Sequence, residues 1–173
     1  MDLKKYIREV ADFPQPGISF KDITTLIGDA AAYREVVDQI TAHFANQGIT
    51  RVVSLESRGF IVGGALAYRL GAGFVPIRKA GKLPASTIAM SYDLEYGTDT
   101  IEIHADALSP QDVVLIHDDL LATGGTALAA LNLVRKMKVS RIYLSFICDL
   151  QFIQTPLKEE LQKYEPHVLV SYP

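Results

Sequence analysis

The sequence predicts an α/β fold: an open, mostly parallel sheet flanked by helices, with a small N-terminal cap and a β-hairpin. Short apolar runs, RVVSLE (51–56), GFVPI (73–77) and VVLIHD (113–118), alternate with segments of helical periodicity. With 173 residues and 49% hydrophobic content, the chain can bury the core of one domain. Strands separated by helices at this spacing pair in parallel, with both faces of the sheet covered.

Further elements complete the alternation. Residues 29–47 are predicted to form an amphipathic helix with Asp29 as its N-cap. The segment SRGFIVGGALAYRL leads into a second helix, which ends at Gly71. A helix over about 125–137 and a strand over 141–150 follow the third apolar run.

Two segments do not fit this alternation, and the first 25 residues, with Pro14, Pro16 and Gly17, are expected to form a separate small cap. KAGKLPAST (79–87) is basic, contains glycine and proline, and is typical of a mobile loop. Residues 88–105 alternate around a Tyr-Gly-Thr-Asp turn and predict a β-hairpin that extends from the sheet. We therefore expect one domain over residues 1–173, with a cap at about 1–25 and a lid and hairpin at about 79–105.

Composition excludes several classes of function. A net charge of −3 and a pI near 5.8 provide no basic face for binding duplex nucleic acid as a main task. Cys148 is the only cysteine, so an intramolecular disulfide and a four-thiolate zinc site are excluded, and a small buried hydrophobe is expected there. Neither a signal peptide nor an apolar run of about 18 residues is found, which predicts a soluble, cytoplasmic protein with no membrane partner.

The stretch DDLLATGGT (118–126) joins a predicted strand to a predicted helix. In open α/β sheets, ligands bind at such carboxyl ends of strands. The amides of Ala-Thr-Gly-Gly-Thr, the two threonine hydroxyls and the helix N-terminus can surround a phosphate. The chain lacks both the lysine of a GxxxxGK[ST] loop and a GxGxxG motif, which argues against nucleoside triphosphatases and dinucleotide-binding proteins.

The adjacent Asp118 and Asp119 have a different predicted role. They would repel a phosphate in direct contact, but each can accept a hydrogen bond from a hydroxyl one sugar's width away. The vicinal diol of a ribose 5-phosphate supplies two such donors. The alternative is an ordinary acidic turn before a capped helix, which is less favoured because two acids on a buried strand carry a desolvation cost without a partner.

These residues carry a family resemblance. VVLIHDDLLATGGTA resembles the signature of the type I phosphoribosyltransferases, which bind 5-phosphoribosyl 1-pyrophosphate (PRPP). Four further stretches resemble the adenine-using members of that family: DFPQPGISFKDIT (12–24), ESRGFIVGGALA (56–67), PIRKAGKLPAST (76–87) and SYDLEYG (91–97). The resemblance implies an α/β transferase of purine salvage, which transfers the 5-phosphoribosyl group of PRPP to adenine and releases AMP and pyrophosphate.

The resemblance also implies roles for the polar residues. The acidic pair would bind the ribose hydroxyls, and the 5-phosphate would be bound by the loop of Ala122, Thr123, Gly124, Gly125 and Thr126. Ser57 and Arg58 would line the pyrophosphate. A mobile lid, which in this family closes over pyrophosphate, is matched by Arg78, Lys79 and Lys82. Taken without the resemblance, those three cations would indicate only a solvated loop.

The adenine pocket is implied in the same way. GISFKDI resembles a base-binding hood, in which Phe20 would cover one face of the purine and Leu120 the other. Main-chain atoms near Ser19 and Lys21 would bind the base edge; many relatives carry a larger apolar residue and an arginine at these two positions. Tyr96 could shield the pocket. Phe20 as a core residue is the alternative reading.

Glu95, in SYDLEYG, matches the acid/base candidate of the family. Displacement of pyrophosphate at the anomeric carbon builds oxocarbenium character, and a carboxylate beside the purine imidazole could exchange its proton. Arg58 and Lys82 complete the candidate catalytic set. An exposed hairpin position is the alternative for Glu95.

Mg²⁺ is expected to enter with PRPP and to take no direct protein ligand, with Asp118 or Asp119 touching it through water. A homodimer is implied because the lid arginine of this family typically crosses the interface. Two other functions remain open: transfer to xanthine or guanine, and a regulator that senses PRPP. A regulator needs a DNA-binding segment, and residues 1–12 are too short for a helix-turn-helix. Lys136, Lys138 and Lys158 are expected to be solvated.

Overall fold

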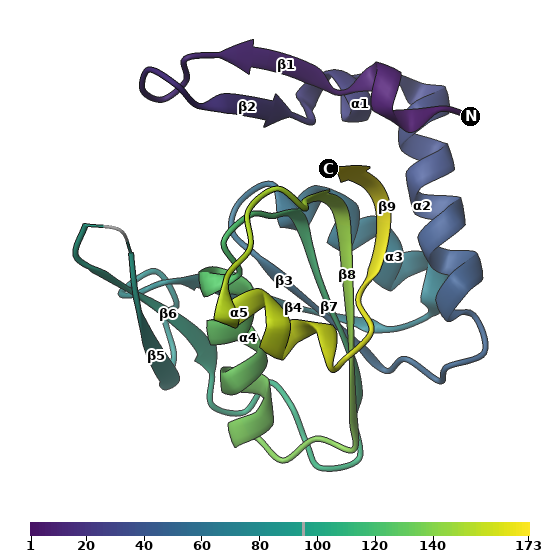
Figure 1. The fold of residues 1–173 in the computed structure, drawn as a ribbon. Helices are drawn as coiled ribbons and strands as arrows, with labels where there is room; N and C mark the ends of the chain where they lie inside the picture. Colours follow the sequence, from purple (N-terminus) through teal and green to yellow (C-terminus); the bar gives the residue numbers. More distant parts are fainter. Residues whose placement is uncertain (95) are drawn as a thin grey trace.

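The computed structural model describes residues 1–94 and 96–173 (Figure 1). Within them, a seven-stranded sheet has the order β5-β6-β4-β3-β7-β8-β9. Its parallel part consists of β3 (Arg51–Leu55), β4 (Gly73–Lys79), β7 (Val113–Leu121), β8 (Arg141–Leu150) and β9 (His167–Tyr172). The predicted α/β fold with an open, mostly parallel sheet is confirmed.

The hairpin expected over residues 88–105 extends from one edge of this sheet. Its strands, β5 (Thr87–Asp93) and β6 (Thr98–His104), pair antiparallel along their whole length. Strand β6 also pairs antiparallel with the end of β4, where Arg78 lies opposite Glu102. The hairpin therefore continues the central sheet, and it projects to the side of the molecule in Figure 1.

Helices cover both faces of the sheet. One face carries α1, α2 and α3, whereas α4 and α5 pack on the other. The helices are α1 (Thr24–Gly28), α2 (Ala30–Phe44), α3 (Gly59–Leu70), α4 (Gly125–Lys136) and α5 (Pro156–Gln162).

Local signals explain where the helices of the first face begin and end. The Asp29 carboxylate accepts the N–H groups of Ala31 and Ala32, which satisfies two otherwise unpaired amides of α2. Gly71 ends α3 in the left-handed conformation, with φ of +65°. Helix α2 stops at Phe44, three residues before the predicted end at 47.

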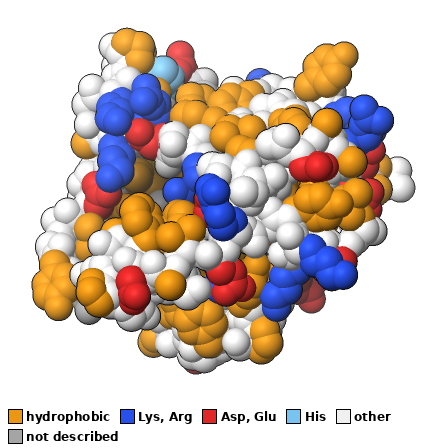
Figure 2. All heavy atoms as spheres, turned by 90° about the horizontal axis from the view of Figure 1, so that it is seen from above, with side chains coloured by type: hydrophobic (Ala, Val, Ile, Leu, Met, Phe, Trp, Pro, Cys, Tyr) orange, Lys and Arg blue, Asp and Glu red, His pale blue; other side chains and the backbone are white. Residues whose placement is uncertain are grey.

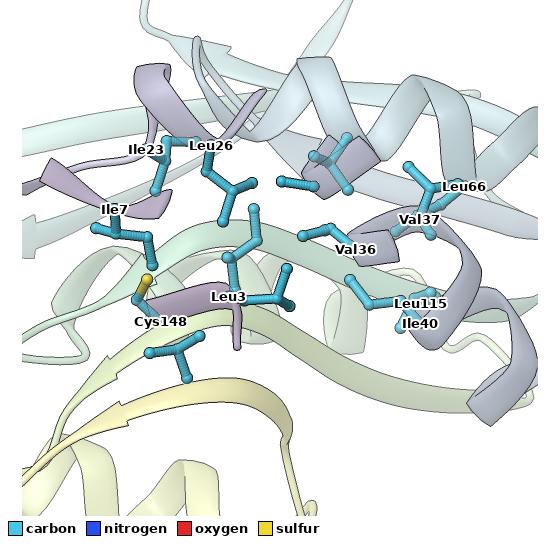
Figure 3. Packing of buried hydrophobic residues seen from close by; sticks show 14 of the residues in the cluster. Leu3, Ile7, Ile23, Leu26, Val36, Val37, Ile40, Leu66, Leu115 and Cys148 are labelled. Atoms are coloured by element: carbon cyan, nitrogen blue, oxygen red, sulfur yellow. The ribbon is translucent and has the colours of Figure 1, made fainter. Parts of the chain in front are cut away.

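The N-terminal residues contribute to the core of the first face. Leu3, Ile7, Ile23 and Leu26 pack with side chains of α2 and α3 and with Cys148 on β8 (Figure 3). Cys148 is fully buried, and burial raises the pKa of its thiol to about 12. This cysteine therefore acts as a small hydrophobe, as the sequence indicated.

A small N-terminal hairpin lies beside the sheet as a separate two-stranded unit. It consists of β1 (Arg8–Ala11) and β2 (Ser19–Asp22), preceded by the 3₁₀ helix Leu3–Tyr6. The ammonium groups of Lys4 and Lys21 lie 4.4 and 4.5 Å from the centre of the Tyr172 ring. These cation–π contacts fasten the hairpin to the last strand of the sheet.

The segment after β8 differs from expectation. The sequence predicted no element beyond residue 150, yet α5 and β9 both form there. Lys136 and Lys138 are exposed, but the prediction of a solvated Lys158 is wrong: this residue is only 4% exposed. Its Nζ lies 2.6 Å from Oδ1 of the buried Asp149 and donates to the Leu150 carbonyl at 2.8 Å. Burial of Lys158 is possible because its charge is paired with the Asp149 carboxylate and its ammonium is hydrogen-bonded.

The surface on the side of the N-terminal hairpin intermixes basic, acidic and hydrophobic side chains (Figure 2). Within the part of the chain that the structure describes, no helix has both the length and the apolar character needed to cross a membrane.

Candidate active site

A cavity of about 490 Å³ lies at the carboxyl ends of β3 and β7. Its volume is in the range of small-molecule sites. Two strand-to-helix turns supply most of the wall, and the end of β4 and the β5–β6 hairpin supply the rest. The lining residues are Glu56, Ser57, Arg58, Lys79, Tyr92, Asp99 and the continuous run from Asp118 to Ala127.

The turn between β7 and α4, residues 122–126, presents unpaired amides to the cavity. Gly124 has φ of +89°, a conformation that glycine adopts without strain. The N-cap of α4, Gly124, has no side chain to cap the helix, and the Gly125 N–H makes only a long bond of 3.5 Å to Thr123 Oγ1. In the described part of the chain, the N–H groups of Gly124 and Thr126 donate to no protein acceptor. These amides and the helix N-terminus form a site suited to an anion.

Asp118 and Asp119 lie beside this turn on the last residues of β7. Asp118 Oδ1 accepts the N–H of Asp119 at 2.9 Å, and burial together with the neighbouring carboxylate raises the pKa of Asp118 well above its usual range. A Cβ at position 59 would come within 2.7 Å of Asp118 Oδ1, so Gly59 allows α3 to approach this close.

Arg58 links the acidic pair to the N-terminal hairpin. Its Nε donates to Asp119 Oδ2 at 2.5 Å, and its guanidinium carbon lies 5.4 Å from the centre of the Phe20 ring. Burial opposes the charged form of Arg58, but the Asp119 carboxylate outweighs burial and raises the pKa of the guanidinium. The arginine is therefore a cation at the cavity, paired with the acidic pair in the free protein.

Glu56 contacts all three predicted lid cations. The sequence analysis did not single out this residue. Its carboxylate accepts the Lys79 N–H at 2.6 Å and the Lys82 ammonium at 3.1 Å, and Arg78 Nε lies 3.5 Å away. Partial burial opposes ionisation, but these donors outweigh it and lower the pKa of Glu56. Arg78 and Lys82 thus lie next to the cavity through Glu56, and Lys79 lines it directly.

Tyr92 and Asp99 are cavity residues that the sequence analysis also missed. Tyr92 OH accepts the Thr126 hydroxyl at 3.3 Å and donates to Asp99 Oδ2 at 3.4 Å, while the Lys79 ammonium lies 3.3 Å from the same oxygen. The predicted hairpin could have indicated this contact, because its two strands place Tyr92 and Asp99 opposite each other. Their contact fixes the hairpin against the anion-binding turn.

The predicted adenine-pocket residues are only partly brought together. Leu120 lines the cavity, and Phe20 lies beneath Arg58 and packs edge-on against Phe13 at 5.2 Å. Tyr96 is 84% exposed and does not line the cavity.

The two remaining residues predicted for this pocket, Ser19 and Lys21, differ in placement. Ser19 is exposed, and its hydroxyl accepts the Lys21 ammonium at 3.1 Å. The Lys21 side chain also pairs with Glu9 at 2.9 Å and covers Tyr172, so only its main chain is available to a base. Glu95, the predicted acid/base residue, lies outside the described residues.

His117 precedes the acidic pair but is no proton donor at neutral pH. It is fully buried, and burial lowers the pKa of its imidazole to about 3. Its Nδ1 lies 3.4 Å from Ser145 Oγ on the neighbouring strand. The residue is therefore a neutral core imidazole.

The chain is similar to known phosphoribosyltransferases in sequence and in structure. Residues 22–161 match the family described as "Phosphoribosyl transferase domain". The adenine phosphoribosyltransferase of Bacteroides fragilis is 58% identical over 149 residues, which cover 86% of this chain and 84% of that protein.

Two solved structures have nearly the same fold. The adenine phosphoribosyltransferase of Rhodothermus marinus superposes with a TM-score of 0.91 at 49% identity, over 98% of this chain and 96% of that one. The enzyme of Giardia lamblia in complex with 9-deazaadenine superposes with a TM-score of 0.92 at 40% identity, over 99% and 97%.

Proposed function

This chain belongs to the phosphoribosyl transferase family, among the adenine phosphoribosyltransferases, and we propose how its cavity carries out their reaction. The enzyme acts in purine salvage: it transfers the 5-phosphoribosyl group of PRPP to adenine and yields AMP and pyrophosphate. The observation that carries this function is the meeting, in one cavity, of an acidic pair with a turn suited to an anion.

The turn of residues 122–126 binds the 5-phosphate of PRPP. Its free amides and the N-terminus of α4 complement the negative charge. Asp118 and Asp119 accept hydrogen bonds from the ribose hydroxyls, and these bonds are strongest when the carboxylates are ionised. When PRPP binds, its ribose hydroxyls therefore donate hydrogen bonds that offset the desolvation cost of the two buried carboxylates.

Arg58 changes partner when PRPP binds. In the free protein its guanidinium neutralises Asp119. A pyrophosphate next to Ser57 and Arg58 offers the guanidinium a stronger anion, and a ribose hydroxyl then takes the released oxygen of Asp119. The substrate carries both groups, so the exchange leaves neither charge unpaired.

The lid cations also exchange a protein carboxylate for the substrate. Glu56 holds Lys82 and the Lys79 amide in the free protein. A pyrophosphate at the mouth of the cavity competes with Glu56 for Arg78, Lys79 and Lys82. Closure of these cations over the leaving group stabilises its developing charge and excludes water from the anomeric carbon.

Adenine enters between the N-terminal hairpin and β7. Phe20 and Leu120 provide apolar surfaces for the two faces of the purine, and main-chain atoms near Ser19 and Lys21 bind its edge. Glu95, placed here by the sequence resemblance alone, accepts the proton that the imidazole ring loses as its nitrogen bonds to the anomeric carbon and pyrophosphate leaves.

The donor set of the cavity fits a magnesium ion that arrives with PRPP. Asp118 and Asp119 offer carboxylate oxygens, the ligand type that Mg²⁺ prefers. Among the described residues, no group of three or more acidic, histidine or cysteine side chains is placed to hold a metal ion. We propose that PRPP and water supply most of the ligands. When bound, Mg²⁺ neutralises charge on the departing pyrophosphate.

We also propose a homodimer, because the lid arginine of this family often reaches a neighbouring subunit. In a single chain, Arg78 Nε lies 3.5 Å from Glu56 Oε1, and α3 exposes the large side chains of Ile61 and Tyr68. Exposed apolar side chains on one helix are typical of a protein interface.

AMP formation from adenine and PRPP tests the function directly, with hypoxanthine, guanine and xanthine as competing bases. We expect adenine to be preferred. In the double variant Asp118→Asn/Asp119→Asn, loss of two charge-assisted hydrogen bonds should weaken PRPP binding by about 1.5–3 kcal/mol for each bond. Preference for another base, or unchanged PRPP affinity by calorimetry, would contradict the proposal.

A further inference from the structure

Helix α5 and its cap, which belong to the segment without sequence signals, contact the anion-binding turn. In Figure 1, α5 lies beside α4, and the two helices pack together. We propose that Thr155 is a positioning residue for the 5-phosphate: its hydroxyl holds the Thr123–Gly124 peptide so that the N–H of Gly124 faces the cavity. This inference rests on the proposed binding of the 5-phosphate by residues 122–126.

A single hydroxyl connects the turn to the helix. Thr155 Oγ1 donates to the Thr123 carbonyl at 2.6 Å and accepts the N–H of Lys158 at 3.1 Å. A hydroxyl has one proton and two lone pairs, so it can do both at once. The group that caps α5 is thus also the group that fixes the turn.

The geometry of the peptide bond transmits this contact to the cavity. The cis bonds of the described chain are Phe13–Pro14 and Glu56–Ser57, so the Thr123–Gly124 bond is trans. In a trans peptide the C=O and N–H groups point in opposite directions. Because the Thr123 carbonyl points to α5, the Gly124 N–H points away from it, and this N–H donates to no protein acceptor in the described residues.

The body of α5 restricts the same turn. A Cβ on Gly124 would lie 3.1 Å from Lys158 Cγ, 3.2 Å from Lys158 N and 3.3 Å from Leu161 Cδ1. The left-handed φ of +89° at Gly124 adds a second reason for glycine. The turn is therefore packed directly against α5, which leaves little room for a side chain at position 124.

Helix α5 is itself attached to the central sheet. The ammonium of Lys158 bonds to Asp149 and to the Leu150 carbonyl at the end of β8. Asp149 pairs in register with Leu121, the last residue of β7 before the turn. Strand β8, α5 and the turn therefore form a closed loop of contacts, which holds the phosphate-binding amides in place before the substrate arrives. Such preorganisation lowers the cost of ordering the turn on binding.

Two substitutions at Thr155 test the proposal by calorimetry with ribose 5-phosphate as the probe. Thr155→Val removes the hydroxyl at nearly constant volume, and we expect about 5- to 10-fold weaker binding, the range for one lost hydrogen bond. Thr155→Ser keeps the hydroxyl and should bind ribose 5-phosphate as the wild type does. With PRPP varied, KM should rise in the Val variant, whereas KM for adenine should stay unchanged.

A control separates positioning from loss of a helix cap. Asp29→Ala removes the cap of α2 and should lower Tm as Thr155→Val does, but without changing affinity for ribose 5-phosphate. The inference is overturned if Thr155→Val lowers Tm and leaves that affinity intact, or if the wild type does not bind ribose 5-phosphate. Failure of the wild type to make AMP, with ribose 5-phosphate still bound, would instead contradict the proposed function.

Discussion

At the scale of single residues, Asp118 shows how binding and stability oppose each other. Burial and the Asp119 carboxylate raise the pKa of Asp118 above its ordinary value of 3.8. A carboxyl whose pKa is raised on folding stabilises the fold in its protonated form, and this contribution is lost as pH rises through the raised pKa. Above its ordinary pKa, Asp118 therefore costs the free enzyme stability, because the unfolded chain ionises where the folded chain resists ionisation.

Asp118→Asn should accordingly stabilise the free enzyme at pH 7 while it weakens PRPP binding. We expect a gain of about 0.5–2 kcal/mol in the free energy of unfolding, as is common when a strained functional group is neutralised. Urea unfolding at several pH values measures this gain, which should vanish at low pH, where Asp118 of the wild type is protonated. A variant that is less stable than the wild type at pH 7 would contradict the argument.

Glu95 belongs to the same scale, as the proposed acid/base residue. Glu95→Gln keeps the size of the side chain but cannot exchange a proton, so kcat should fall by about 10²–10⁴-fold while adenine still binds. Single-turnover measurement shows whether chemistry limits the rate. If it does and the Gln variant retains near-full kcat, Glu95 at most positions the base.

At the scale of elements, the lid cations lie in two places: Arg78 and Lys79 are at the end of β4, and Lys82 is in the turn of residues 80–86 between β4 and β5. Lys82 pairs with Glu56 in the free protein, and we expect it to move onto pyrophosphate during catalysis. Lys82→Ala should therefore lower kcat more than it raises KM for adenine. The exposed Lys138, far along the chain in another turn, provides the matched control: Lys138→Ala should change neither constant. Wild-type constants in Lys82→Ala would reduce the basic turn to a solvated surface.

Helix α5 depends on one buried ion pair. Lys158→Met leaves the Asp149 carboxylate buried without its partner, and the free energy of unfolding should fall by about 3–5 kcal/mol. Replacing both partners, as Lys158→Met/Asp149→Leu, should recover most of this loss because no charge is left unpaired. Chemical denaturation of the two variants and of the exposed control Lys136→Met distinguishes these outcomes; equal losses in the single and double variants would contradict them.

Sequence patterns predicted some elements well and others not at all, for physical reasons. Continuous apolar runs identify β3, β4 and β7, because strands covered on both faces need apolar side chains on both. In β9, HVLVSY is only partly buried, and α5 is short, so neither has a strong period. The burial of Lys158 depends on Asp149, a partner that only the fold brings near.

The same limit applies to the active site. Motif resemblance indicated the acidic pair and the anion-binding turn, since these residues are contiguous in sequence. Glu56 meets Lys79 only because Leu55 of β3 lies in register with Ile77 of β4, which places the next residues side by side. No local pattern encodes that register.

At the scale of the whole molecule, the proposed homodimer can be measured. Sedimentation equilibrium should give twice the 19.0 kDa mass of one chain. Ile61→Glu and Tyr68→Glu on α3 should shift the enzyme toward the monomer if α3 contributes to the interface, since a buried unpaired charge is costly. A monomeric wild type with full activity would exclude a catalytic role for a second subunit.

The cation–π contacts between Tyr172 and the two lysines bring the chain ends into one neighbourhood, because Lys4 Nζ also reaches the Ser171 carbonyl at 3.5 Å. The protein is thus a natural candidate for circular permutation, with a short peptide joining residue 173 to residue 1 and new ends opened in the exposed turn around Lys138. Conversely, an affinity tag on either original end would emerge next to the N-terminal hairpin, where we propose that the base binds, so a tag is better placed at the permuted ends.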